Sequence, residues 1–207
     1  MAKNKLLIGE VALLLALAVT MLWGAWSLQE QDVLERKMIR LHVIANSDTQ
    51  EDQTLKLQVR DEVLAQATAI LEESLDMKQA VAQLEQALPD IEETARRKIA
   101  AQGYDYAVSA KLEQTEFPTK EYDGFSLPSG EYLALRVIIG DGAGQNWWCV
   151  VFPPLCTTAA TDLEKTAIAT GLGEGDLSLI TEENQGYVLK FRSLELWESL
   201  RQWLKKH

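Results

Sequence analysis

Residues 39–48 read Ile-Arg-Leu-His-Val-Ile-Ala-Asn-Ser-Asp, and this stretch passes from one regular structure to another. In its first seven residues every second side chain is apolar, which is the period of a β-strand. The polar residues that follow are candidate N-caps, and Asp48 and Glu51 have the spacing of a capping box. Apolar residues then recur at helical spacing to about Glu72, so the sequence predicts a strand followed by a helix.

The same two periods predict the remaining elements of the chain. Pro89 lacks a backbone N–H donor and suits a helix start, so one helix is expected to end before it and a second to begin after it. The glycine-rich stretch 140–145 joins two strands and predicts an antiparallel hairpin, whereas 117–130 is expected to be loop. Helices are expected at 76–88, 90–101, 161–171 and from Ser193, and strands at 104–112, 131–139, 146–152, 177–181 and 187–192.

This order of elements predicts an α+β fold. Runs of helices and runs of strands are segregated, which favours a mainly antiparallel sheet packed with several helices, preceded by a hydrophobic leader helix. The expected organisation is a signal peptide or membrane anchor at 1–27, a linker at 28–38 and a single exported domain at 39–207.

The leader resembles an export signal. Two lysines precede an apolar run at residues 11–23, which has the length of a signal-peptide hydrophobic region. Ala25 and Ser27 are small residues spaced as before a cleavage site, whereas retention would leave residues 6–23 as a membrane anchor. Cleavage and retention both stay open, and in either case the rest of the chain is expected to be exported, with the membrane contacted through this leader.

The charge of the chain argues against nucleic-acid binding. The 207 residues include 31 acidic and 20 basic side chains, which give a formal net charge of −11 at pH 7. Proteins that bind a phosphate backbone present a basic face, and the sequence contains no run of lysine and arginine of that kind. No nucleic-acid partner is therefore expected.

The two cysteines, Cys149 and Cys156, are separated by six residues that include a Pro-Pro pair. An oxidising compartment would permit a disulfide between them, and the alternative is two buried thiols. Two cysteines with no histidine near them do not have the spacing of a zinc site.

The sequence offers little for catalysis. His42 and the C-terminal His207 are the two histidines, and a Cys149–His42 pair lacks any nucleophile motif around it. No ligand spacing for a metal and no cofactor motif is present, so no enzyme activity, metal or cofactor is expected. Trp147 and Trp148 are adjacent on a predicted strand and must point to opposite faces, so one is a candidate surface anchor unless both faces are covered.

Three blocks of the sequence resemble the stage II sporulation protein R family. The most specific is Asn-Trp-Trp-Cys-Val-Val-Phe-Pro-Pro-Leu-Cys at 146–156. The others are residues 39–48 with 51–53, 55–57 and 59–61, and residues 117–120 with 130–140, and a C-terminal pattern from Phe191 to Trp203 also matches.

The resemblance implies a signal rather than an enzyme. Members of the family are made in the forespore of endospore-forming bacteria and exported into the space between forespore and mother cell. The resemblance further implies activation of a membrane-embedded aspartic protease of the mother-cell membrane, which processes pro-sigma-E. An exported thiol hydrolase and a general envelope scaffold are the alternatives.

The residues that contact the protease partner are a separate hypothesis. The polar side chains around the strand-to-helix junction are the first candidates, and their alternative role is helix capping with a local ion pair. The tryptophan pair supplies the aromatic candidates. The predicted partner-binding residues are His42, Asn46, Asp48, Asp52, Arg60, Trp147 and Trp148.

Overall fold

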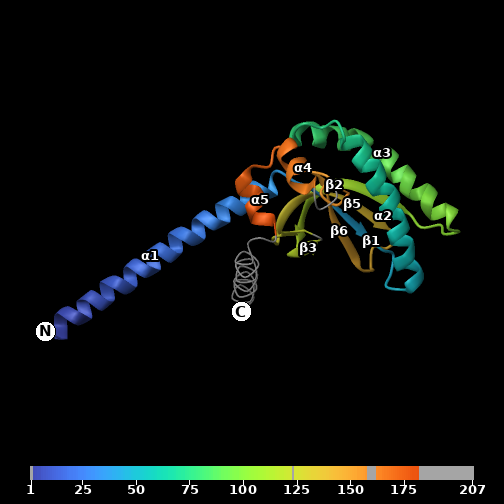
Figure 1. The fold of residues 1–207 in the computed structure, drawn as a ribbon. Coiled ribbons are helices and arrows are strands. Elements are labelled where there is room, and N and C mark those ends of the chain that lie inside the picture. The colour runs from blue at the N-terminus through green and yellow to red at the C-terminus, as the bar shows by residue number, and fades with distance from the viewer. Residues whose placement is uncertain (1, 123, 158–161, 182–207) are drawn as a thin grey trace. The chain divides into compact units, whose positions relative to one another are not determined.

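The structure is a computed structural model that describes residues 2–122, 124–157 and 162–181 (Figure 1). The chain divides into two compact units, the first ending at Leu34 and the second beginning at Glu35. Helix α1 (Ala2–Glu35) includes the predicted leader and most of the predicted linker. None of the helices in the described part of the chain combines the length and the apolar character needed to span a membrane.

The second unit is built on a four-stranded sheet in the order β2-β5-β1-β6. β1 is antiparallel to β6 and β5 is antiparallel to β2, whereas the central pair β1 and β5 is parallel. The α+β class and an antiparallel-rich sheet are therefore confirmed, with one parallel pair at its centre. The strands are β1 (Ile39–Ile44), β2 (Val108–Phe117), β5 (Gly130–Ile139) and β6 (Asn146–Phe152), and a separate hairpin consists of β3 (Lys120–Tyr122) and β4 (Phe125–Leu127).

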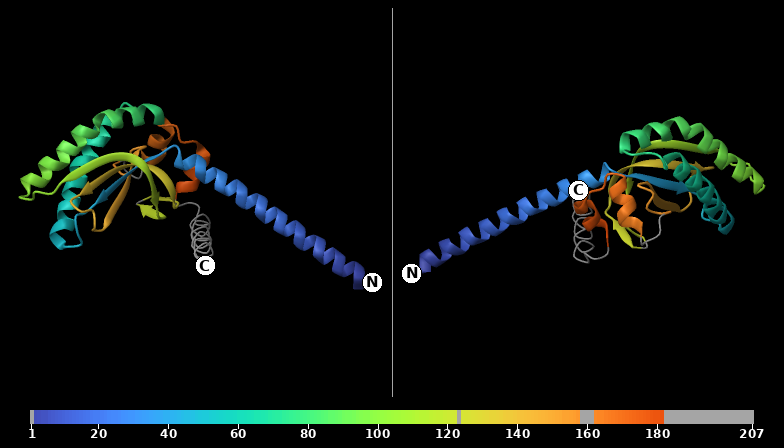
Figure 2. Two further views of the ribbon diagram at one scale, coloured as in Figure 1. Left: turned by 180° about the vertical axis from the view of Figure 1, so that it is seen from behind. Right: turned by 45° about the horizontal axis from the view of Figure 1, so that its top comes forward.

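Two long helices, α2 (Gln50–Leu71) and α3 (Met77–Ala101), cover one face of this sheet (Figures 1 and 2). The core lies between them and the strands, because the apolar side chains of both helices meet alternate residues of β1 and β5. The short helices α4 (Leu163–Ala169) and α5 (Glu174–Ile180) follow β6. Core side chains include Leu41, Val43, Val59, Val63, Leu84, Ile91, Leu135 and Val137.

The predicted hairpin of β5 with β6 is wrong. All six residues of β1 are buried, as expected of a central strand, and β1 lies between β5 and β6. Residues 140–145 therefore form an arch over the end of β1, where Gly144 N–H donates to Ala45 O at 3.0 Å and Ala143 N–H donates to Asn46 O at 3.1 Å. The alternation at 131–139 and the apolar run at 146–152 identified both strands correctly, but neither pattern carries information about which strand lies between them.

The arch requires glycine where it crosses the chain after β1. A Cβ atom at Gly144 would lie 2.2 Å from Ser47 O, a backbone atom that cannot rotate away. We expect Gly144→Ala to lower the free energy of unfolding by about 1–3 kcal/mol through overpacking, measured by urea denaturation. Gly175→Ala is the matched control, since a Cβ there meets nothing within 4 Å. Equal stability of the two variants would contradict the close approach.

Three further predictions are corrected. One helix, α3, continues through Pro89, whose ring is exposed, and the helix bends partway along its length (Figure 1). The strand predicted at 177–181 is largely helix α5, because Asp176 accepts a hydrogen bond from Gly173 N–H and stabilises a helix start there. The predicted loop 117–130 contains the β3–β4 hairpin. The elements predicted after residue 186 lie outside the described residues.

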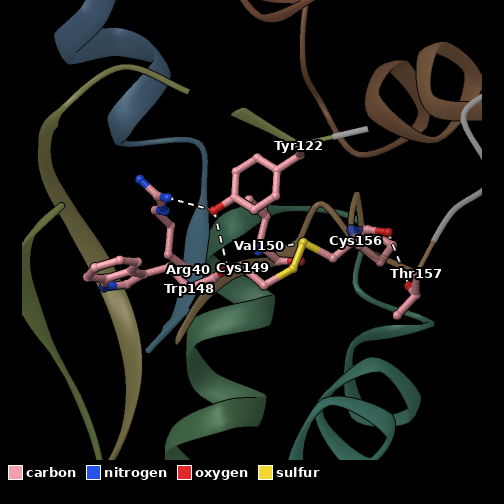
Figure 3. The surroundings of a disulfide bond; sticks show 8 residues. Arg40, Tyr122, Trp148, Cys149, Val150, Cys156 and Thr157 are labelled. Carbon is pink, nitrogen blue, oxygen red and sulfur yellow. Dashed lines mark hydrogen bonds between the residues drawn. A yellow bond between two sulfur atoms is a disulfide. The ribbon is translucent and has the colours of Figure 1, made fainter. Parts of the chain in front are cut away.

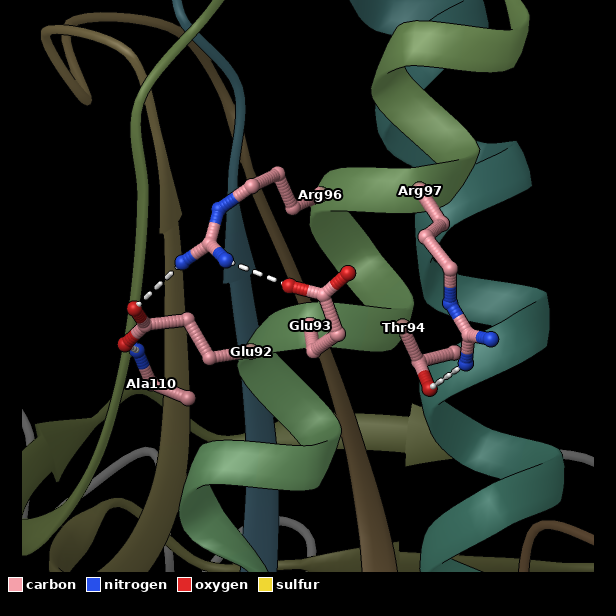
Figure 4. A network of polar contacts seen from close by, with 6 residues as sticks. All are labelled: Glu92, Glu93, Thr94, Arg96, Arg97 and Ala110. Carbon is pink, nitrogen blue, oxygen red and sulfur yellow. Dashed lines mark hydrogen bonds and ion pairs between the residues drawn. The ribbon is translucent and has the colours of Figure 1, made fainter.

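Strand β2 begins at Val108, four residues later than predicted, and extends to Phe117. Its edge is tied to α3 by Glu92, which accepts a hydrogen bond from Ala110 N–H at 3.2 Å and one from Arg96 at 3.0 Å (Figure 4). An edge-strand amide that would otherwise be open to pairing is thus bonded to the helix layer.

Candidate functional site

The junction between β1 and α2 is organised around the buried carboxylate of Asp52. Its Oδ2 atom accepts hydrogen bonds from the side chains of Asn46 at 2.9 Å and Ser47 at 2.6 Å. The Asp52 N–H donates to Thr49 Oγ1, so Thr49 rather than Asp48 is the N-cap of α2. These bonds, the one from Ser47 foremost, hold the pKa of Asp52 below its ordinary value although burial opposes them. The carboxylate is therefore ionised and bonded within the chain.

The same junction holds the arch in place. Asn46 Oδ1 accepts a hydrogen bond from Asp141 N–H at 3.0 Å, and Asp48 Oδ1 accepts one from Gln145 N–H at 2.7 Å. Three of the predicted partner-binding residues, Asn46, Asp48 and Asp52, are thus brought together, and the hydrogen bonds described above join them to other residues of their own chain. Their geometry indicates a structural role, capping and bracing the junction, and partner contact there stays a prediction.

Arg60 and Trp147 stand apart from those junction contacts. The Arg60 guanidinium lies 4.7 Å from the centre of the Trp147 ring and pairs with Asp61 at 2.6 Å. Trp147 packs against the core between the helices and the sheet. Its contribution is therefore to packing, with a cation–π contact at its outer side.

His42 and Trp148 lie on the other face of the sheet. His42 is 6% exposed, and its Nε2 atom is 2.9 Å from Asn146 Oδ1. Its ring stacks on Trp148 with centroids 5.8 Å apart. Because the Asn146 oxygen accepts, Nε2 carries the proton of the neutral ring and Nδ1 is left as the second, buried nitrogen without a partner.

The strand register places His42 in a line of side chains that crosses the whole sheet. Lys111 of β2 is opposite Arg136 of β5, Arg136 is opposite His42 of β1, and His42 is opposite Trp148 of β6. We call these four residues the cross-strand row. Like charges directly opposite each other destabilise a sheet, so Lys111 beside Arg136 is a pairing that stability alone does not favour.

Arg40, two residues before His42 on the same face, is completely buried. Its Nη2 atom donates to the hydroxyl of Tyr122 at 2.9 Å, and that hydroxyl donates to Trp148 O at 3.3 Å (Figure 3). The guanidinium carbon lies 4.0 Å from the centre of the Phe117 ring and 4.8 Å from that of Tyr132. Within the described residues no carboxylate pairs with this arginine.

Several donors on this face are buried without a hydrogen-bond acceptor among the residues that the structure describes. They are Nε and Nη1 of Arg40, Nε of Arg136 and Nε1 of Trp148. Most buried polar atoms in folded proteins are bonded, and leaving one unsatisfied is destabilising. Their concentration in one place marks this face, rather than the junction, as the candidate binding site.

The positive charges of this face act on His42. Burial lowers the pKa of His42 below its ordinary value, and the nearby Arg136 and Arg40 guanidinium groups lower it further. The hydrogen bond to Asn146 and the Glu113 carboxylate oppose this shift. His42 is therefore neutral at pH 7, and its face gathers the basic side chains of Arg40, Lys111 and Arg136 within an acidic chain.

This pKa shift makes stability depend on pH. The folded pKa of His42 lies below the unfolded value of 6.5, so the unfolded state binds more protons and stability falls as pH drops from 6.5 through the folded pKa. In this pH range the free energy of unfolding changes by up to about 1.4 kcal/mol per pH unit because of His42, and we expect His42→Gln to remove that contribution. Urea denaturation of both proteins at several pH values between 7.5 and 5 measures it. Parallel pH profiles for the two proteins would contradict the shift.

The cysteines do not support thiol chemistry. Cys149 and Cys156 form a disulfide, with their Cα atoms 6.2 Å apart (Figure 3). Cys149 is opposite Leu41 and packs in the core, whereas His42 is on the other face, so the imagined Cys149–His42 pair does not form. Among the residues that the structure describes, no three His, Cys, Asp or Glu side chains gather as a metal site would need.

Sequence reasoning selected His42 and Trp148 but missed Arg40, Lys111 and Arg136. The available signal was the charge on the second face of strands whose first face is apolar, in a chain with an excess of acidic residues. That signal places residues on a face, but the register that aligns them across four strands is visible only in the structure.

Comparison with known proteins shows which family of proteins the chain is similar to. The family model described as stage II sporulation protein R matches residues 35–162. Stage II sporulation protein R of Bacillus subtilis (strain 168) is 37% identical over 124 residues, which cover 60% of this chain and 55% of that relative. The chain therefore spans about half the length of this curated relative. No solved structure matches the chain.

Proposed function

This chain belongs to the stage II sporulation protein R family, and from that premise we propose that it is a signal of endospore formation rather than an enzyme. In this proposal the chain is exported from the forespore and activates a membrane-embedded aspartic protease of the mother-cell membrane. The activated protease then processes pro-sigma-E.

The observation that carries the proposal is the family match over residues 35–162. That range contains the complete four-stranded sheet, both long helices and the cross-strand row. A binding face built on a rigid sheet suits a protein that acts by contact with a partner. The resemblance implies that members of the family act as triggers, and a face with unsatisfied hydrogen-bond donors supports such a role for this chain.

Two features support export. The apolar side chains between Val11 and Met21 on α1 are exposed, as in a leader that is recognised by the export machinery or held in a membrane. The Cys149–Cys156 disulfide is of a kind that persists in oxidising compartments.

The test uses cells that contain the protease and pro-sigma-E, with this full-length chain exported across the same membrane, retained inside by deletion of residues 2–23, or absent. Cleavage of pro-sigma-E only in the exporting cells is the expected result. Cleavage that does not depend on the chain would remove the proposed function, and cleavage with the retained form would remove the requirement for export.

A further inference from the structure

Resting on the proposed function, we propose that the cross-strand row is the docking surface for the protein partner, and that the partner presents a segment whose carboxylates face Arg136 and Lys111. The occupant is thus an acidic stretch of a protein.

The cations of this face are only partly compensated within the chain. The Nε atoms of Arg40 and Arg136 and the Trp148 indole N–H are buried without acceptors among the described residues, so they mark the uncompensated charge but are not themselves open to a partner. The accessible part is the Arg136 side chain, which is 34% exposed and uses Nη1 for Glu113. A guanidinium group forms strong, charge-assisted hydrogen bonds with a carboxylate. His42 adds a buried nitrogen in the middle of the row that lacks a partner and becomes a donor when the ring is protonated.

The charge of this face is opposite to that of the chain as a whole. The chain has a formal net charge of −11, yet this face gathers Arg40, Lys111, Arg136 and Lys120, whose Nζ atom lies 4.4 Å from the centre of the Trp148 ring. Glu113 pairs with the Nη1 atom of Arg136 at 2.7 Å, and the Nε atom of Arg136 has no partner among the described residues. An acidic segment is attracted here and repelled by most of the remaining surface.

The cross-strand row is accessible at its two ends and at Arg136. Lys111 is exposed, the Arg136 side chain is 34% exposed, and Trp148 is half-buried. The row crosses four strands, so at a strand spacing near 4.8 Å it is roughly 14 Å long. That length suits a few residues of an extended peptide, and a half-buried tryptophan at one end is the kind of residue that anchors protein interfaces.

The experiment reverses single charges in the full-length chain and measures processing of pro-sigma-E as the amount of exported chain is varied. We expect Arg136→Glu and Lys111→Glu each to raise the amount needed for half-maximal processing by roughly tenfold or more, because like charges then face the partner. Arg136→Lys keeps the positive charge but loses the bidentate hydrogen bonding of a guanidinium group, so it is expected to have an intermediate effect. Substitution of an acidic residue of the partner by lysine is expected to restore processing with Arg136→Glu.

Lys98→Glu is the matched control, since Lys98 is on α3, on the helix-covered side, and pairs with Glu62 at 2.8 Å. Normal accumulation of each variant, with a thermal unfolding midpoint near that of the wild type, separates docking from folding. Lys111 is exposed on an edge strand, so Lys111→Glu keeps the test valid if Arg136→Glu fails to fold.

The outcomes separate the two proposals. Processing by the wild type together with normal processing by both row variants would overturn the docking surface and leave the proposed function standing. No processing by the wild type would overturn the proposed function itself. Binding of the purified full-length chain to phosphatidylglycerol vesicles that is lost in Arg136→Glu would assign the row to a lipid surface and overturn the acidic protein segment.

Discussion

Asp52→Ala is expected to lower the free energy of unfolding by about 3 kcal/mol, because it removes the acceptor at the centre of the junction. Asn46 and Ser47 both donate to this carboxylate. Their donors would be left in a site where Asp52 itself is 4% exposed. The variant also removes a negative charge from the first turn of α2, where it interacts favourably with the helix dipole. Urea denaturation monitored by tryptophan fluorescence measures the change.

Asp61→Ala is the control on the same helix, since the Asp61 side chain is 64% exposed and its loss is expected to change stability by less than about 0.5 kcal/mol. The pH profile gives a second readout. The pKa of Asp52 is lowered, so its stabilising contribution is present above 3.8 and is lost as pH falls through the folded pKa. Asp52→Ala is expected to lack that acid-side loss, and equal stability of the two alanine variants would contradict the role given to Asp52.

Arg40→Met is expected to raise the free energy of unfolding by about 1–2 kcal/mol, because a buried charge that has no carboxylate partner among the described residues is replaced by an apolar side chain of similar length. Two cation–π contacts and the bond to Tyr122 favour the arginine. Desolvation of the guanidinium and two unsatisfied nitrogens outweigh them. Under the proposed function, the same substitution is expected to weaken triggering of pro-sigma-E processing, since it removes a positive charge beside the cross-strand row.

Arg97→Met on α3 is the comparison for this substitution. Arg97 is exposed and donates to Thr94 at 3.1 Å (Figure 4), so the change is expected to alter stability by less than about 0.5 kcal/mol. A stability gain in Arg40→Met with reduced triggering would mean that the arginine is retained for binding at the expense of the fold. A loss of several kcal/mol would instead show that the aromatic contacts make Arg40 a structural residue.

The strands and helices that form the core were predictable from periodicity alone. The strand predicted from Ile39 is β1, residues 146–152 are β6, and the helix expected from Thr49 to about Glu72 is α2. The first strand and the helix have an apolar repeat that matches burial on one face, whereas residues 146–152 were recognised as a short run that is apolar on both faces. The parallel pairing of β1 with β5 was not predictable, because alternation identifies a strand and is silent about its neighbours.

Local rules failed where tertiary contacts overrule them. Pro89 permits continuation of α3 because its ring is exposed and the helix remains packed on both sides of it. Only part of the candidate site was predictable, because the sequence shows residue types but not the pairing of strands. His42 and Trp148 were chosen as residue types suited to recognition, whereas Lys111 and Arg136 gain their meaning from register with His42.

The position of β1 has a consequence for how the polypeptide acquires its structure. The central strand is among the first segments of this unit to be synthesised, yet both of its neighbours, β5 and β6, lie between residues 130 and 152. Until those residues are available, an apolar strand with two open edges has no pairing partner. Contacts this distant in sequence form slowly, because a long loop must close before they contribute. The central sheet therefore cannot be completed before the residues of β6 have been synthesised, and that delay would suit passage of an unfolded chain across a membrane in the export proposed above.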